Sequence, residues 1–210
     1  MSDLLALFPL PNVVLFPGVF LPLHIFEPRY REMVADALAT DRLIGMALLR
    51  EGWEGDYEER PRVYSVGCSG LITHSENLPD GRYNIVLRGL DRFRIVGEDQ
   101  TRPYRRARTE PMPEPGLTSQ DRVLLRQLRA RIEALIAPSD QGGGIDARAA
   151  EAMSDQDLVN ALAQYLDLEP IEKQALLEQP DVSARATSLI ELLEMKTLIA
   201  RHPSVPPLPN

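Results

Sequence analysis

Chemically active residue types are scarce in this 210-residue sequence. Its single cysteine, Cys68, excludes a disulfide within the chain, and this predicts a reducing, cytoplasmic location. No glycine directly precedes a lysine, so the phosphate-binding pattern Gly-x-x-x-x-Gly-Lys-Ser/Thr is absent. The lysines and histidines are Lys173, Lys196, His24, His74 and His202. We therefore expect no ATP hydrolysis by this route and few groups for covalent catalysis.

The sequence also lacks a long, uninterrupted hydrophobic run. Residues 4–26 are mostly apolar, but prolines at positions 9, 11, 17 and 22 interrupt them, and no arginine or lysine precedes Arg29. Proline is excluded from helix interiors, so this segment predicts neither a membrane span nor a signal peptide. We expect a protein that does not associate with membranes.

No combination of residues predicts a catalytic or metal centre. The histidines are too far apart in the chain for a zinc-ligand pattern. Cys68 and His74 are a weak candidate for a nucleophile and its base, and a buried thiol is the better interpretation. Ser69 lacks the Gly-x-Ser-x-Gly elbow of hydrolases. A solvated acidic loop is the best interpretation of Asp56, Glu58 and Glu59. We expect no catalytic residue, metal or cofactor, and no enzymatic activity.

The charge distribution bears on whether nucleic acid is a binding partner. The formal net charge is −8, and an acidic protein is repelled by nucleic acid phosphates on average. One segment, Arg82–Arg108, has eight arginines against three acidic residues, and aromatic residues are interleaved with them. Arginine and aromatic side chains together can bind RNA phosphates and bases. An RNA- or nucleotide-binding strip at Arg82–Arg108 is therefore the alternative hypothesis, although the overall charge disfavours nucleic acid as a partner.

The composition changes near residue 110 and divides the chain. Residues 1–110 contain short β-type runs, whereas residues 118–201 have helical periodicity. Between them, the proline-rich residues 111–117 suit an extended linker. Residues 202–210 contain four prolines and suit an extended tail. The pattern predicts an α+β fold, with a β-rich subdomain followed by a small helical bundle.

In the first part we expect roughly six short strands and one early helix. The first strands are expected at Asp3–Phe8, Val13–Phe16 and Leu43–Arg50. Glycines at 67, 70 and 89 are expected to bend or break the later ones. The helix is expected to begin at Pro28, because proline is favoured at the first helical position. Its apolar stripe is Tyr30, Met33, Val34, Ala37 and Leu38.

Four helices are expected in the second part. Thr118 is the predicted N-cap of the first, Thr118–Ile136, and Gly142–Gly144 is a predicted connector. The apolar stripe of that first helix is expected at Val123, Leu124, Leu128, Ile132, Leu135 and Ile136. The other three are expected at Ser154–Leu166, Pro170–Leu177 and Asp181–Arg201.

The segment Leu7–Tyr30 has a distinctive sequence, LFPLPNVVLFPGVFLPLHIFEPRY. It resembles the beginning of the Lon protease N-terminal domain, also called the LON substrate-binding domain. Val66–Cys68 with Gly70, and Tyr83–Ile95, are similar to two later signatures of that family. The resemblance extends over about residues 3–200 and is closest to a stand-alone bacterial form of the domain.

This resemblance implies a PUA-like β pseudo-barrel followed by a helical bundle. In full-length Lon proteases the domain precedes an ATPase and a Ser–Lys peptidase, so a peptidase label here would be inherited from the family name. The resemblance implies a non-catalytic module that binds unfolded or apolar polypeptide segments or a protein partner. Weak self-association into a homodimer is a further alternative. The candidate binding residues are Phe16, Phe20, Leu21, Phe26, Arg29, Tyr30, Arg92 and Phe93. Core packing of the apolar residues, and a structural ion pair of Arg92, are the alternatives.

Overall fold

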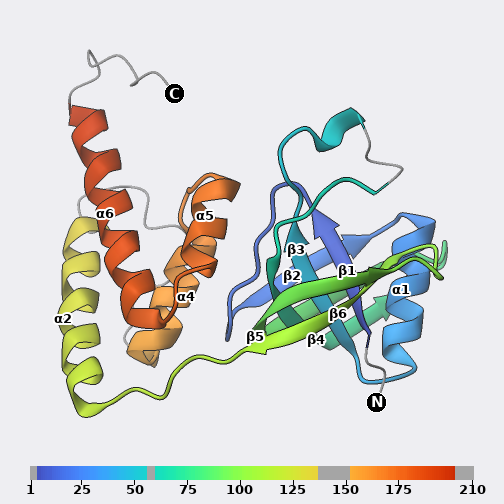
Figure 1. Cartoon of the computed structure of the whole chain (residues 1–210), viewed down its shortest axis with the longest axis horizontal. Helices are drawn as coiled ribbons and strands as arrows, with labels where there is room; N and C mark the ends of the chain where they lie inside the picture. Colours follow the sequence, from blue (N-terminus) through green and yellow to red (C-terminus); the bar gives the residue numbers. More distant parts are fainter. Residues whose placement is uncertain (1–3, 56–59, 137–151, 202–210) are drawn as a thin grey trace. The chain divides into compact units, whose positions relative to one another are not determined.

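The computed structural model describes residues 4–55, 60–136 and 152–201 (Figure 1). The chain divides into two compact units. The first, here called the β unit, comprises Met1–Glu114 and Leu168–Glu178, and the second, the helical unit, comprises Pro115–Asp167 and Gln179–Asn210. The predicted tail at 202–210, the glycine connector and the acidic loop around Glu58 lie outside the described residues.

Six strands form the β unit, and five of them close into a ring. They are β1 (Leu5–Leu10), β2 (Phe20–Ile25), β3 (Leu43–Leu48), β4 (Val66–Asn77), β5 (Tyr83–Asp99) and β6 (Arg105–Met112). The sheet order is β2-β5-β4-β3-β1-β6, and β6 also pairs with β5. Only the β1–β3 pairing is parallel among these ladders. The predicted α+β class, a β pseudo-barrel followed by helices, is confirmed.

The long strand β5 lets both β2 and β6 share one of its edges. Its first half, Tyr83–Arg88, pairs with β2, and its second half, Arg92–Asp99, pairs with β6. Gly89 lies between the halves, and β5 continues through it, so this glycine does not end the strand as expected. β2 therefore attaches beside the ring and has only β5 as a strand partner in the described residues.

Helix α1 (Pro28–Leu38) packs against β1 and β3 with the stripe predicted from its spacing (Figure 1). Tyr30, Met33, Val34 and Ala37 are buried, and the Tyr30 ring lies 4.5 Å from the ring of Phe8. Pro28 occupies the first turn, where its missing N–H breaks no helical hydrogen bond. The sequence spacing thus identified both the beginning of this helix and the face that it buries.

The proline-rich segment before β2 is irregular and buried. Val13–Phe16 was expected to be a strand, but it forms none, and the residues that follow it, Gly18 and Val19, are hydrogen-bonded to Gly89. The main-chain N–H of Gly18 donates to the carbonyl of Gly89 at 2.9 Å, and the Gly89 N–H donates to the carbonyl of Val19 at 2.8 Å. Gly18 has φ of 77°, which favours glycine. This arrangement fixes where β2 begins.

Helix α5 (Pro170–Leu177) belongs with the β unit, although residues 118–201 were expected to form one helical subdomain. The Gln174 side chain donates to the main-chain carbonyl of Val66 at 3.0 Å. The Arg92 side chain donates to the carbonyl of Leu177 at 2.9 Å. These buried polar contacts between residues far apart in sequence explain why the units differ from the expected division.

The helical unit is built from α2 (Ser119–Ile136), α4 (Asp155–Tyr165) and α6 (Val182–Arg201). The predicted cap is present, since Thr118 accepts from the Asp121 N–H, and Ser154 accepts in the same way from the Asp157 N–H. The expected stripe of α2 is partly wrong, since Val123 and Leu124 are exposed and Leu125 is buried with Ile132. These two are seven residues apart, and that spacing sets the buried face. No helix in the described ranges is long and apolar enough to cross a membrane.

Candidate functional site

An exposed row of side chains follows the outer face of β2. Side chains alternate across a strand, so Leu21, Leu23 and Ile25 point inward and the even-numbered residues point outward. The β2 row, as we call it, consists of Phe20, Pro22, His24 and Phe26. Phe20 is 50% exposed and Phe26, directly after the strand, is 60% exposed. Two phenylalanines so exposed on one short segment are the most pronounced apolar surface feature of this unit.

The strand pairing of β2 is one-sided among the described residues. β2 contacts β5 on one side, from Phe20 opposite Arg88 to Ile25 opposite Tyr83, and no described strand covers its other side. Pro22 lies in this strand, and proline is confined to sheet edges because it lacks the N–H that a ladder needs. An edge strand offers unpaired main-chain groups to an incoming extended segment.

Polar contacts hold the His24 end of the row. Nδ1 of His24 lies 2.8 Å from Oδ1 of Asn84, and the Asn84 amide nitrogen donates to Glu76 at 2.9 Å. The Arg82 guanidinium, which can only donate, lies 3.3 Å from Nε2 of His24. These partners match a neutral imidazole protonated on Nδ1. The ring of His24 stacks 6.3 Å from that of Phe26, so the same contacts orient the aromatic end of the row.

The structure narrows the candidate residues predicted from the sequence. Phe16, Tyr30, Arg92 and Phe93 are between 0% and 5% exposed, so they belong to the packed interior and do not meet a partner in this conformation. Phe93 packs with Leu7 and Ala107 in the interior, and the ring of Tyr30 packs against that of Phe8. Leu21 is half-buried. The exposed candidates that remain are Phe20 and Phe26.

Arg29 has a defined role of its own. Its guanidinium forms an ion pair with Glu27 at 2.9 Å and lies 4.7 Å from the centre of the Tyr30 ring. The side chains of Arg29 and Glu27 are each about one-fifth exposed. These contacts account for Arg29 through local structure at the beginning of α1, without a ligand.

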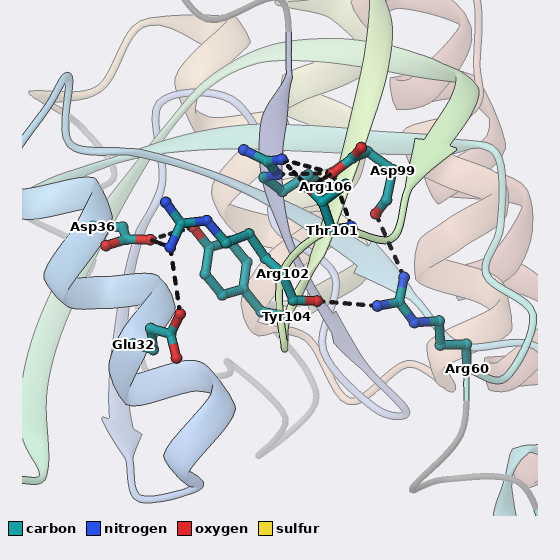
Figure 2. A network of polar contacts seen from close by, with 8 residues as sticks. All are labelled: Glu32, Asp36, Arg60, Asp99, Thr101, Arg102, Tyr104 and Arg106. Atoms are coloured by element: carbon teal, nitrogen blue, oxygen red, sulfur yellow. Dashed lines mark hydrogen bonds and ion pairs between the residues drawn. The ribbon is translucent and has the colours of Figure 1, made fainter.

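The Arg82–Arg108 strip is largely neutralised by neighbouring carboxylates. Five of its eight arginines form ion pairs, and only three lack one among the described residues. The pairs are Arg82–Asp80, Arg92–Glu114, Arg102 with Glu32 and Asp36, Arg105–Glu98, and Arg106–Asp99. Figure 2 shows the Arg102 and Arg106 pairs. A strip compensated in this way presents little net positive charge to phosphates.

The residues considered as nucleophiles have structural roles. Cys68 is fully buried. The Ser69 hydroxyl donates to the main-chain carbonyl of Asp91 at 3.0 Å and accepts from the Asp91 N–H at 3.2 Å, which joins β4 to β5. His74 lies on the exposed part of β4. In the part of the chain that the structure describes, no group of three or more histidine, cysteine or acidic residues is placed to hold a metal ion.

Comparison with known proteins adds the family. A model described as the ATP-dependent protease La (LON) substrate-binding domain matches residues 5–195. "Lon protease 2" of Myxococcus xanthus is 30% identical over 204 residues, and "Lon protease" of Trichlorobacter lovleyi is 30% identical over 195. These alignments cover 95% and 91% of this chain but 24% of each relative, so the chain spans about a quarter of the length of the curated relatives it matches.

Two solved structures share the fold. The N-terminal domain of the Mycobacterium avium complex Lon protease has a TM-score of 0.70 at 19% identity, covering 91% of this chain and 98% of that one. The Lon N-terminal domain protein from Xanthomonas campestris has a TM-score of 0.59 at 24% identity, covering 90% and 97%. The expected resemblance is confirmed, and the chain belongs to the LON substrate-binding domain family of ATP-dependent protease La.

Proposed function

We propose that this protein binds extended, apolar polypeptide segments, and that the β2 row and the open edge of β2 form the binding surface. The observation that carries the proposal is the coincidence of two exposed phenylalanines with a strand edge that no described strand covers. The family description, a substrate-binding domain, supports a polypeptide as the ligand. No bond is made or broken in this function, and no cofactor is needed.

The binding mode combines main-chain pairing with side-chain burial. An extended segment adds a strand beside β2, and its alternate side chains lie against Phe20 and Phe26. Main-chain hydrogen bonds are independent of sequence, whereas the aromatic contacts select apolar side chains. The β2 row is short, so we expect dissociation constants in the micromolar range, near −8 kcal/mol. Binding that is largely independent of sequence and of modest affinity suits the recognition of unfolded chains.

Replacing both phenylalanines should weaken this binding. We expect the F20S/F26S double variant to bind a fluorescently labelled, permanently unfolded carboxymethylated protein at least tenfold more weakly, as measured by fluorescence anisotropy. The physical reason is the lost apolar contact, about 1.4 kcal/mol or more for a tenfold change. V96S is the matched control. Val96 is also 50% exposed, but it lies in the half of β5 that does not pair with β2.

Two outcomes would contradict the proposal. Wild-type affinity in a folded F20S/F26S variant would remove the β2 row from binding, and an equal loss in V96S would show non-specific apolar adhesion. The strand-pairing step is tested with a short apolar peptide that is N-methylated at alternate residues, which should bind more weakly than its unmethylated form. Sedimentation of the free protein separates self-association through β2 from binding of an unfolded chain.

A further inference from the structure

A small pocket in the β unit gathers three arginines. It lies among Arg29 and Tyr30 of α1, Leu49 after β3, Arg60 in the following loop, and Tyr104 and Arg105 at the beginning of β6, with three prolines completing its wall. Its cavity volume is about 20 Å³, which is room for one water-sized group. The pocket, here called the arginine pocket, shares no residue with the β2 row.

Arg105 is the group in this pocket that most lacks a partner. The residue is only 7% exposed, and its one ion pair joins Nε to Glu98 at 3.6 Å. Within the described residues, the buried Nη1 atom has no hydrogen-bond partner. A buried guanidinium with so little compensation is unfavourable, because burial removes water from five N–H donors.

The neighbouring charges increase this imbalance. Burial lowers the pKa of the Arg105 guanidinium, Glu98 opposes that shift, and the charges of Arg60 and Arg29 add to it. Arg60 donates to the main-chain carbonyls of Asp99 at 3.4 Å and Arg102 at 3.1 Å (Figure 2). These are neutral acceptors, and Arg60 forms no ion pair in the described ranges. Among the described residues, the guanidinium groups of Arg29 and Arg105 pair with Glu27 and Glu98, whereas that of Arg60 has no carboxylate partner.

The hydroxyl of Tyr104, the residue before Arg105, already has a hydrogen-bond partner. The Tyr104 hydroxyl donates to Asp36 at 2.7 Å, as Figure 2 shows. Burial and this hydrogen bond raise the pKa of Tyr104 to about 12, so the hydroxyl stays protonated at neutral pH and cannot supply a negative charge. Tyr104 therefore does not compensate the guanidinium of Arg105.

We propose that the arginine pocket binds the carboxylate group of a ligand, with Arg105 and Arg60 donating hydrogen bonds to its oxygen atoms. A carboxylate supplies acceptor oxygens for the unpartnered Nη1 of Arg105, and one of these oxygens fits the small cavity. Guanidinium groups match carboxylate geometry and form strong, charge-assisted hydrogen bonds with it. A tetrahedral phosphate is larger than a carboxylate group and fits a cavity of this size less well. The apolar wall suits the carbon chain that bears the carboxylate.

The proposal is tested by NMR titration at constant ionic strength. N-acetylglycine represents a chain-terminal carboxylate, propionate represents an acidic side chain, and N-acetylglycinamide is the uncharged counterpart. We expect saturable shifts of the Arg105 Nε–Hε and Tyr30 amide signals with at least one carboxylate, at roughly millimolar dissociation constants. The tighter of the two carboxylates identifies the source, and the amide should cause no saturable shift.

Variants assign the effect to the pocket. R105Q and R60Q should each weaken carboxylate binding at least tenfold, and R60Q keeps the test valid if the buried R105Q substitution unfolds the protein. R102Q is the matched control: it removes a nearby charge that pairs with Glu32 and Asp36 but does not line the pocket, so binding should stay within twofold. Wild-type affinity in R60Q, equal binding of the amide, or tighter binding of inorganic phosphate than of both carboxylates would overturn the proposal.

Discussion

Substituting Gly89 by alanine is expected to lower the free energy of unfolding of the β unit by about 3 kcal/mol, because the new methyl group collides with main chain. A Cβ at Gly89 would overlap the carbonyl oxygen of Phe16, and it would lie 3.3 Å from Cγ of Leu15. The colliding atom belongs to backbone, so no side-chain rotation relieves the overlap. The hydrogen bonds between Gly89 and residues 18 and 19 would lengthen as the segments separate.

G97A provides the matched control in the same strand. A Cβ at Gly97 would meet the end of the Arg108 side chain at 3.2 Å, and a flexible arginine can move aside. We expect G97A to change stability by less than about 1 kcal/mol. Urea unfolding monitored by Trp53, the single tryptophan, reports the β unit directly. Equal unfolding midpoints for G89A and the wild type would show that Gly89 does not hold the proline-rich segment closely.

Local patterns in the sequence predict most of the elements and the fold class. Pro28 with the stripe from Tyr30 to Ala37 identifies α1, because both signals depend only on residues within three turns. The family motif in Leu7–Tyr30 supplies the pseudo-barrel, which spacing alone leaves undetermined. The caps at Thr118 and Ser154 are equally local, since each side chain bonds to an N–H three residues away.

What the sequence could not predict depends on contacts between distant residues. The sequence offers Phe16 and Phe93 as candidate binding residues, with core packing as the alternative. The structure shows that both are buried, and nothing near them in the sequence indicates this. The same limit applies to α5, whose apolar pattern resembles that of its neighbours although its polar contacts join it to the β unit. The arginine pocket combines residues 29, 60 and 105, which no local motif connects.

The β2 row was partly visible in the sequence. Phe20 and Phe26 were among the candidate binding residues, but no strand was expected here. All residues of Phe20–Phe26 except His24 are apolar, so no alternation indicates a strand or says which face is buried. Which face of β2 is buried depends on the close approach of Gly18 and Val19 to Gly89, because this contact places β2 beside the first half of β5. Ile25 then points inward and Phe20 outward. The candidate binding surface is therefore a consequence of the same glycine contact that stabilises the core.

Replacing Arg92 by methionine is expected to destabilise the β unit by about 3 kcal/mol and to detach α5 from it. Arg92 is 2% exposed, donates to the Leu177 carbonyl at 2.9 Å, and pairs with Glu114 at 3.1 Å. Methionine fills similar space but leaves that carbonyl and a mostly buried carboxylate without their cation. Hydrogen exchange of the α5 amides should therefore accelerate more than exchange in the ring strands.

Two further variants separate this charge effect from loss of packing. R94M changes the neighbouring exposed arginine of β5 and should alter stability by less than about 0.5 kcal/mol. R92M/E114Q removes both charges of the pair, and we expect it to be more stable than R92M, because the carboxylate is no longer left uncompensated. The Leu177 carbonyl still lacks its donor, so α5 should remain less protected than in the wild type. Unchanged α5 exchange in R92M would show that Gln174 alone holds the helix, and equal stability of R92M and R92M/E114Q would assign the effect to packing.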